Sequence, residues 1–343
     1  MQRRGAKGIA VNGRFTVHRV TGVQRYAWEI TRRLGDRVIT IVPQRFGKGI
    51  LGHAWEQARL PYLSRGSLLW SPCGSGPLSV SRQVVTIHDL APLLHPEWFT
   101  LAYAGWYRWL IPRLCKRVCR IIAVSEFIKR QLVEVCGIPE SRIVVVPNGV
   151  NHCEPRRLGS SDSKVPYFLY VGSLEPRKNL KRLLEAWKIS GVYRDFRLYI
   201  VGAVGNRSVF RELHLPVDLP NVAFLGYVRD ELLDEFYHNA WALVYPSLYE
   251  GFGLPVLEAM ARGTPVITSR ATACEEVAGE AALLVDPTNI ESMAEGLKLM
   301  AYSTSLRSEL AMRAVKRAKG FSWDMSASRT WSVLQTAVFE CSW

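Results

Sequence analysis

Short hydrophobic runs alternate with longer amphipathic segments along the whole chain, which is the pattern of an α/β protein. In the first half we expect helices over 23–34 and 126–136, where apolar residues recur with helical periodicity. In the same half the apolar runs predict strands at residues 8–12, 37–43, 68–70, 84–87, 120–125 and 143–147. Strands that alternate with helices favour a parallel sheet.

The same alternation returns in the second half. Strands are expected at 167–172, 197–202, 222–226, 242–245, 265–268 and 282–285, with helices such as 180–189 and 231–240 and a mostly helical end over 289–340. Residues 151–165 are polar and contain Gly, Ser and Pro, which indicates a linker. The predicted domains are 1–155 and 165–325, followed by a C-terminal helix over 326–343.

A turn between a strand-like run and a helix-like run carries the first candidate chemistry. Its sequence, PSLYEGFGLPVLEAMA, occupies residues 246–261. Glycines allow close approach of the backbone, proline suits a helix start, and a helix N-terminus attracts anions. We therefore expect a phosphate at the backbone amides of Gly251, Phe252, Gly253 and Leu254.

Two glutamates flank this turn. Glu250 and Glu258 are separated by seven residues, so one precedes the helix and the other lies about one turn inside it. Carboxylates accept hydrogen bonds from sugar hydroxyls, so the turn could hold a nucleotide sugar. The alternative is a tight turn from strand to helix with solvated acids.

A second strand-to-helix connection, SLEPRKNL at residues 173–180, places Arg177 and Lys178 at a helix start. Cations are unfavourable there because of the helix dipole, so their presence indicates a bound anion. Two further candidates lie in the first half. His88 follows a buried strand, where open α/β sheets bind ligands, and Gly22 precedes a helix. His88 could equally be a residue that caps a loop, and an ordinary loop glycine is the simpler interpretation of Gly22.

The charge is strongly segregated along the 343 residues. The net charge of +14 arises entirely in residues 1–150, with 22 Lys and Arg against 8 Asp and Glu, whereas residues 151–343 contain 22 of each. This segregation indicates an anionic partner for the first half, such as a lipid head group, a pyrophosphate or nucleic acid. A solubilising surface bias is the simpler alternative.

Residues 98–120 mix aromatic and basic side chains at roughly helical spacing, and Pro112 is expected to end or kink the helix. The mixture suits a membrane interface or an acceptor bound there, and it could also stack the bases of single-stranded nucleic acid. A helix packed in the core with a charged outer face is the third interpretation. The residues assigned to this surface are Trp106, Trp109, Arg113, Lys116 and Arg117.

The remaining composition fits a cytoplasmic enzyme. Hydrophobic content of 48% and charged content of 22% are typical of globular proteins, and no run approaches the roughly 20 apolar residues of a membrane span. The apolar part of the basic N-terminus is too short for a signal peptide. The seven cysteines include no Cys-x-x-Cys pair, so we expect reduced thiols and no metal site.

Several of these segments together resemble one family. The Glu250–Glu258 pair enclosing Gly-Phe-Gly-Leu-Pro is similar to the donor site of retaining glycosyltransferases of family 4. Ser125-Glu126 and the Pro-Asn-Gly-Val run at 147–150 resemble further signatures of that family, so the likeness extends over nearly the whole chain. It implies the GT-B fold, in which two Rossmann-like domains face each other across a cleft and the last helix crosses back to the first domain.

The resemblance also implies roles for single residues. Glu250 is expected to contact the transferred sugar, Glu258 a ribose hydroxyl and Lys178 the donor diphosphate. His88 would face the transferred sugar, and the loop at Gly22 would lie across the cleft from the donor phosphates. Many members of the family carry an arginine where this chain has Ser173, and Arg177 is expected to substitute for it.

The implied activity is sugar transfer from a nucleotide diphosphate with retention at the anomeric carbon. No Asp-x-Asp motif occurs, so we expect side chains and amides, not a metal, to neutralise the leaving diphosphate, and no cofactor. The SLEPRKN variant resembles bacterial mannosyl- and rhamnosyltransferases of polysaccharide assembly. It favours a GDP-sugar such as GDP-mannose, while UDP- and dTDP-sugars stay open.

The expected acceptor is a lipid-linked glycan, on a polyprenyl diphosphate, used in lipopolysaccharide or other polysaccharide biosynthesis. The protein would then be cytoplasmic and peripheral on the inner face of the cytoplasmic membrane. Two other classes compete with this interpretation. A nucleotide-sugar 2-epimerase of the same fold would release a free sugar epimer, and a non-catalytic module would bind an anionic polymer through the basic half.

Overall fold

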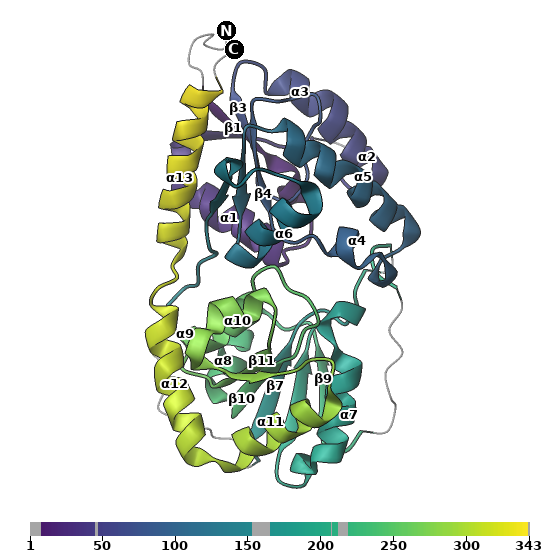
Figure 1. Cartoon of the computed structure of the whole chain (residues 1–343), viewed down its shortest axis with the longest axis vertical. Helices are drawn as coiled ribbons and strands as arrows, with labels where there is room; N and C mark the ends of the chain where they lie inside the picture. The colour runs from purple at the N-terminus through teal and green to yellow at the C-terminus, as the bar shows by residue number, and fades with distance from the viewer. Residues whose placement is uncertain (1–7, 45–46, 153–164, 207, 212–218, 342–343) are drawn as a thin grey trace. The chain divides into compact units, whose positions relative to one another are not determined.

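The computed structural model describes residues 8–44, 47–152, 165–206, 208–211 and 219–341. The chain divides into two compact units (Figure 1). The first unit contains Met1–Leu90, Gly105–Gly149 and Trp323–Trp343, and the second contains Ala91–Ala104 and Val150–Ser322. The predicted linker over 151–165 lies almost wholly outside the described residues.

The first unit is built on a parallel six-stranded sheet. Its strands, in the order β2-β1-β3-β4-β5-β6, are β1 (Ile9–Asn12), β2 (Val38–Ile41), β3 (Leu68–Ser71), β4 (Gln83–Ile87), β5 (Arg120–Ala123) and β6 (Ile143–Val145). Every residue of β1, β3 and β4 is buried, as expected for strands covered on both faces. The strand pattern predicted from the sequence is therefore confirmed in this unit.

Helices cover the first sheet. They are α1 (Gly22–Leu34), α2 (Gly49–Ala54), α3 (Leu60–Leu63), α6 (Glu126–Cys136), most of α5 (Leu101–Arg117), and the C-terminal α13 (Trp323–Glu340). A π-helical turn, Trp55–Arg59, joins α2 to α3, and the hydrophobic pattern did not predict this helical region. The last helix packs against α1 and the sheet of the first unit, with ion pairs Arg33–Asp324 and Arg120–Glu340 (Figure 1).

The second unit repeats the architecture with a second parallel six-stranded sheet. Its strands, in the order β12-β11-β10-β7-β8-β9, are β7 (Tyr167–Val171), β8 (Arg197–Val201), β9 (Val222–Gly226), β10 (Ala242–Tyr245), β11 (Val266–Ser269) and β12 (Leu283–Val285). Phe168, Trp187 and Leu297 lie in the core between this sheet and its helices. The helices are α4 (Ala91–Leu94), α7 (Leu180–Ser190), α8 (Asp230–Asn239), α9 (Leu254–Ala261), α10 (Ala273–Ala278), α11 (Ile290–Tyr302) and α12 (Thr304–Ala318).

Each sheet has one point where the strand order reverses direction. In the first unit the chain runs from β1 to β2 on one side and then returns to place β3 on the other. In the second unit β8 and β9 follow β7 on one side, and β10 returns to its other side. Loops diverge at such a switch point, and ligands of open α/β sheets bind there, beyond the carboxyl ends of the strands.

Two details differ from the expectations. Of the two outcomes expected at Pro112, an end of the helix is wrong, because α5 continues through it to Arg117. The thiols are not all reduced, because Cys119 and Cys341 are bonded, with Cα atoms 6.3 Å apart. The packing of α13 on the first unit brings together these two cysteines, which are 222 residues apart in sequence. Such a bond is unusual for a cytosolic protein.

No helix among the residues that the structure describes combines the length and the apolar character that crossing a bilayer requires.

Candidate active site

The second unit gathers three of the predicted residues at its switch point. Arg177 and Lys178 lie in the short helix Pro176–Lys178 that follows β7, and Glu250 lies in the loop that follows β10. These two strands are neighbours in the sheet, so their carboxyl ends present both segments to the same edge. Segments about 70 residues apart in sequence thereby meet in one cluster.

Glu250 is the centre of this cluster. The Lys178 ammonium donates to its Oε1 at 2.5 Å, the Tyr245 hydroxyl donates to the same oxygen at 2.9 Å, and Arg177 Nη1 donates to its Oε2 at 3.2 Å. Only 6% of Glu250 and 7% of Lys178 are exposed, so the charges lie out of water. A buried carboxylate needs such partners, and here both oxygens have them.

The electrostatics favour an ionised carboxylate. Burial alone would raise the pKa of Glu250, but the charges of Lys178 and Arg177 outweigh it and lower that pKa to about 2. Burial and the nearby Glu250 charge raise the pKa of Tyr245 well above its usual value. Tyr245 is thus a neutral hydroxyl that can donate to the carboxylate, although no role was expected for it from the sequence. Tyr245 is the last residue of β10, a strand at the switch point, and this position in the sequence could have identified it as a candidate site residue.

Arg177 also pairs with a second buried carboxylate. Its Nε lies 2.6 Å from Oε1 of Glu175, which is 1% exposed. Ser173, two residues after the end of β7, is half-buried and supplies no charge. Two cations and two carboxylates therefore alternate around the switch point. A diphosphate bound there would share Arg177 and Lys178 with these acids.

The loop that follows Glu250 leads directly into α9. Gly253 adopts φ +96°, and a Cβ atom at this position would lie 2.7 Å from Sγ of Cys274, so only glycine fits. Gly251 and Phe252 are buried, and the Phe252 ring packs 6.0 Å from Phe321. The helix begins at Leu254, and Pro255 in its first turn has no N–H to leave unpaired. The predicted turn into a helix N-terminus is confirmed.

Glu258 lies one turn inside α9. It is half-buried, and its Oε2 accepts a hydrogen bond of 2.9 Å from the Tyr237 hydroxyl. This tyrosine is 1% exposed and holds the carboxylate from the neighbouring helix α8. The carboxylate is therefore oriented by the protein and is not a freely solvated acid.

The first unit contains the other predicted site residues. His88 follows β4, its Nε2 donates to the Pro72 carbonyl at 2.7 Å, and its ring packs edge-on at 4.8 Å from Tyr26. Burial lowers the pKa of His88 despite the opposing influence of that carbonyl, so the imidazole is neutral near pH 7. Gly22 is the exposed first residue of α1, after the capping residue Thr21.

A buried carboxylate at the switch point of the first unit was not predicted. Glu56 is fully buried, and its Oε1 accepts from Asn12 Nδ2 at 2.7 Å and from Ser75 Oγ at 3.0 Å. Its Oε2 accepts from Arg14 Nη1 at 3.3 Å, and Arg14 also contacts His53 Nδ1 at 3.1 Å. Burial would raise the pKa of Glu56, but the hydrogen bond of His53, the charge of Arg14 and the bond from Asn12 lower it.

The aromatic and basic residues of 98–120 divide between the interior and the surface. Trp106 is half-buried against His53 at 5.1 Å and Trp109 at 5.3 Å. Trp109 is 42% exposed and lies under the Arg113 guanidinium at 5.1 Å. Arg113, Lys116 and Arg117 are exposed on α5.

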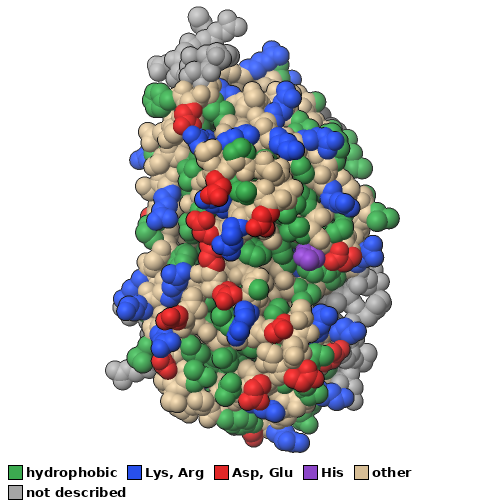
Figure 2. Space-filling view, in the orientation of Figure 1, with side chains coloured by type: hydrophobic (Ala, Val, Ile, Leu, Met, Phe, Trp, Pro, Cys, Tyr) green, Lys and Arg blue, Asp and Glu red, His purple; other side chains and the backbone are tan. Residues whose placement is uncertain are grey.

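Neighbouring helices extend this surface. Ile50 is 88% exposed on α2, and Tyr62 on α3 is 57% exposed, with the guanidinium groups of Arg59 and Arg65 over its ring. Figure 2 shows Lys and Arg side chains beside hydrophobic ones over this part of the first unit, while acidic and basic side chains mix over the second unit.

Comparison with known proteins places this chain in a family. Residues 155–320 match the model described as glycosyl transferases group 1, and residues 69–153 match the model described as glycosyltransferase family 4. The chain is 30% identical over 267 residues to O-antigen chain mannosyltransferase B of Escherichia coli, covering 74% of this chain and 70% of that protein.

Solved structures share the fold. Sucrose-phosphate synthase from Thermosynechococcus elongatus superposes with a TM-score of 0.76 at 18% identity, covering 98% of this chain and all of that one. Anabaena HepE, solved in complex with UDP-glucose, has a TM-score of 0.73 at 16% identity, with coverage of 96% and 99%.

Two parallel six-stranded α/β units with these relatives define a GT-B protein. The chain belongs to the group 1, family 4 glycosyltransferases and is a transferase, as the resemblance in the sequence indicated.

Proposed function

We propose that this glycosyltransferase transfers a hexose from a nucleotide diphosphate donor to a lipid-linked glycan with retention of anomeric configuration. Mannose is the hexose that we favour. The observation that carries the proposal is the buried cluster of Arg177, Lys178 and Glu250 beside the N-terminus of α9. Two cations and a helix N-terminus suit a diphosphate, and an ionised carboxylate suits sugar hydroxyls. The similarity to an O-antigen chain mannosyltransferase supports mannose, and hence GDP-mannose as donor.

In this mechanism Lys178 and Arg177 stabilise the charge that grows on the leaving diphosphate. Groups held in place before the reaction are effective because they need no reorganisation in the transition state. Both cations are already fixed by Glu250 and Glu175, and Arg177 supplies the charge that Ser173 lacks. The amides between Gly251 and Leu254 contribute further donors.

The carboxylates orient the donor. Glu250 is ionised and accepts hydrogen bonds from the transferred sugar, while Glu258, held by Tyr237, accepts from a ribose hydroxyl. We propose departure and attack on the same face of the sugar, with the leaving phosphate taking the proton of the acceptor hydroxyl. His88, neutral through burial, would face the sugar as a hydrogen-bonding group, and the Gly22 loop would approach the donor phosphates.

Transfer and epimerisation make different products from the same donor, so one experiment separates them. The protein is incubated with GDP-mannose, UDP-glucose and dTDP-rhamnose, and protection against thermal unfolding identifies the donor. Products are then analysed by NMR with and without a polyprenyl-diphosphate glycan. The proposal expects protection by GDP-mannose and an α-linked product only when acceptor is present. Release of a free sugar epimer without acceptor would establish the epimerase instead.

We further propose that the protein works peripherally on the cytoplasmic leaflet, docked through the surface formed by α2, α3 and α5. Exposed Trp109, Tyr62 and Ile50 lie there beside Arg113 and Arg59. Aromatic side chains favour the membrane interface, and each basic residue near an anionic leaflet contributes about 1 kcal/mol.

Vesicles of increasing phosphatidylserine content test this docking. Binding should rise with anionic lipid and fall with salt, because the attraction is screened beyond about 8–10 Å. Reversal of Arg113, Lys116 and Arg117 to Glu should release the protein, whereas reversal of Lys188, Lys298 and Arg313 in the second unit should not. Equal vesicle binding by both triple variants would overturn the docking surface, and preference for single-stranded nucleic acid would favour the binding module.

A further inference from the structure

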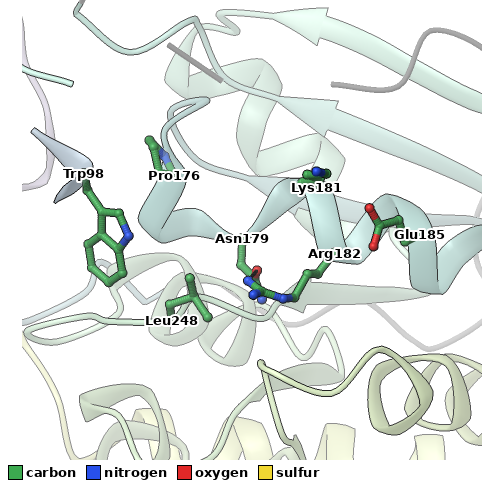
Figure 3. A pocket seen from close by; sticks show the side chains of 7 residues that line it. All are labelled: Trp98, Pro176, Asn179, Lys181, Arg182, Glu185 and Leu248. Carbon is green, nitrogen blue, oxygen red and sulfur yellow. Dashed lines mark hydrogen bonds between the residues drawn. The ribbon is translucent and has the colours of Figure 1, made fainter. Parts of the chain in front are cut away.

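A cavity of about 360 Å³ lies in the second unit, beside the start of α7 (Figure 3). Its volume falls in the range of small-ligand pockets. The lining side chains come from three separate places: the connection before α5, the start of α7, and the loop after β10. None of the predicted donor-site residues lines it.

Trp98 forms one wall of this cavity and is held firmly in place. The Trp98 carbonyl accepts a hydrogen bond from the Arg211 N–H at 3.0 Å. Two residues further on, the Thr100 N–H donates to the Val209 carbonyl at 2.9 Å. The His95 ring stacks on the indole at 4.1 Å. An indole has two faces, so stacking on one leaves the other face and the ring edge to line the cavity. The half-buried Trp98 is therefore a rigid apolar wall.

The opposite wall is polar and carries both signs of charge. Lys181, Arg182 and Glu185 project from the first turns of α7, and Arg182 Nη1 donates to Asn179 Oδ1 at 3.1 Å (Figure 3). A site for a free phosphate would favour cations alone. Here a carboxylate lies among the cations and opposite a tryptophan, which suits a neutral ring that carries many hydroxyl groups, such as a sugar. The carboxylate and the cations can form hydrogen bonds with the hydroxyls, and the indole can pack against the C–H groups on one face of the ring.

The cavity shares its backbone with the candidate active site. Leu248 lines it, and the Leu248 N–H donates to the Arg177 carbonyl at 2.8 Å. Asn179, which adopts the left-handed φ of 61°, donates from Nδ2 to the Pro246 carbonyl at 3.0 Å. Two segments are therefore shared: the loop with Glu250 and the segment with Lys178. Each contributes residues both to the candidate active site and to the lining of this cavity.

We propose that this cavity is a glycan subsite that binds a sugar residue of the growing acceptor chain away from the residue that is extended. The inference rests on the proposed transfer to a glycan acceptor. Trp98 packs against the pyranose, and Arg182 and Glu185 bond its hydroxyls. Longer acceptors then bind more tightly than short ones, and chain length affects the KM for the acceptor while leaving kcat nearly unchanged.

Direct binding tests the subsite without requiring transfer. Isothermal titration measures the affinity of the full chain for α-linked manno-oligosaccharides of one to four residues. We expect affinity to rise with length in the wild type, and Trp98→Ala to weaken binding of the tetrasaccharide about tenfold, the scale of one lost aromatic contact. Trp98→Phe should restore much of it. Trp28→Ala, at a tryptophan 44% exposed on α1, is the matched control and should bind like the wild type.

The kinetic arm uses acceptors of the same lengths. Trp98→Ala should raise the KM for the long acceptor and leave transfer to the shortest acceptor unchanged. Glu185→Gln, which keeps the shape of the wall, provides a second variant whose thermal unfolding is expected to match the wild type.

Three results would overturn the subsite. They are equal tetrasaccharide affinity in wild type and Trp98→Ala, a loss of GDP affinity in Trp98→Ala, or binding of inorganic phosphate that Arg182→Ala abolishes. Failure of the proposed transferase activity is a separate outcome. In that case no acceptor is extended, while the titration still reports whether Trp98 holds an oligosaccharide.

Discussion

Glu250 and Glu56 are ionised glutamates buried at the switch points of the second and the first sheet, and their surroundings differ. Glu250 in the second unit is bonded by two cations and a tyrosine. Glu56 in the first unit is bonded by one arginine and by neutral groups, two of which are Asn12 and Ser75. Glu250 is 6% exposed and Glu56 is fully buried.

The difference in bonding partners indicates that the two carboxylates have different functions. Lys178 and Arg177 are positive charges that a bound diphosphate could share, and they lie beside a glycine-containing loop and a helix start. Asn12 ends β1, Ser75 lies in the loop after β3 and Glu56 itself lies in the π-helical turn, so this carboxylate ties three segments together. We therefore expect Glu250 to govern turnover and Glu56 to govern stability.

The largest expected effect is that of Glu250→Gln on turnover. The amide keeps the size of the side chain but removes the charge that holds Lys178 and meets the sugar. Loss of a preorganised electrostatic group can lower kcat by up to about a thousandfold, which corresponds to about 4 kcal/mol of lost transition-state stabilisation. Steady-state transfer assays measure it, with the exposed Glu280→Gln as control. Wild-type turnover in Glu250→Gln would remove Glu250 from the mechanism.

The Glu250→Gln variant should also change how the stability of the protein depends on pH. The pKa of Glu250 is lowered to about 2 in the folded chain from an ordinary value of 4.5, so its contribution to stability is full above pH 4.5 and is lost as the pH falls toward 2. Glu250→Gln should therefore flatten the decline in unfolding free energy across that window. An unchanged acid-unfolding profile would contradict the lowered pKa.

Glu56→Gln should act mainly on stability. It leaves the buried Arg14 without its counter-charge, and breaking a buried pair costs about 3 kcal/mol at the lower end. Urea unfolding measures the change, and Glu134→Gln, at an exposed site in the same unit, is the matched control. If the variant unfolded like the wild type but lost turnover, Glu56 would belong to the acceptor chemistry and the contrast between the two carboxylates would fail.

Lys178→Ala removes a charge stabiliser from the leaving diphosphate. We expect a loss of about a hundredfold in kcat, with Lys188→Ala near the end of the following helix, α7, as control. Arg177→Ala should lose nearly as much if Arg177 serves in place of an arginine at position 173. A variant that is merely less stable, with normal turnover at low temperature, would assign Lys178 to the packing of the loop.

Glu258→Gln should have a smaller effect, confined to donor binding. Its carboxylate is oriented by Tyr237 but lies a helical turn away from the loop with Glu250. Loss of one charged hydrogen bond to a ribose hydroxyl weakens binding by about 1.5 kcal/mol, or roughly tenfold in the KM for the donor, with little change in kcat. A large fall in kcat with unchanged KM would place Glu258 at the reacting centre.

The smallest expected effect is that of chelation. Glu250 and Glu56 are bonded by side chains, and Arg177 and Lys178 supply positive charge for the diphosphate. Activity should therefore be the same in EDTA as in magnesium or manganese. Loss of transfer in EDTA that a divalent cation restores would show that the charge neutralisation has been assigned to the wrong groups.

Much of the fold could be predicted because local patterns carry it. A buried parallel strand must be a short apolar run, and a covering helix must be amphipathic, so both sheets followed from residues close together in sequence. The turn at 246–261 could be recognised for the same reason. Its glycines, proline and glutamates lie within one segment, where backbone and helix-start requirements restrict the residue types.

Contacts between distant segments could not be predicted in this way. Glu56 meets Asn12 across 44 residues, and Cys119 meets Cys341 across 222, so no local pattern couples them. The connection Ala91–Ala104 follows a strand of the first unit yet packs in the second, where Trp98 forms a wall of the cavity. Side chains find such partners only when the sheets have formed and packing brings distant segments together, because burial rewards proximity in space irrespective of distance along the chain.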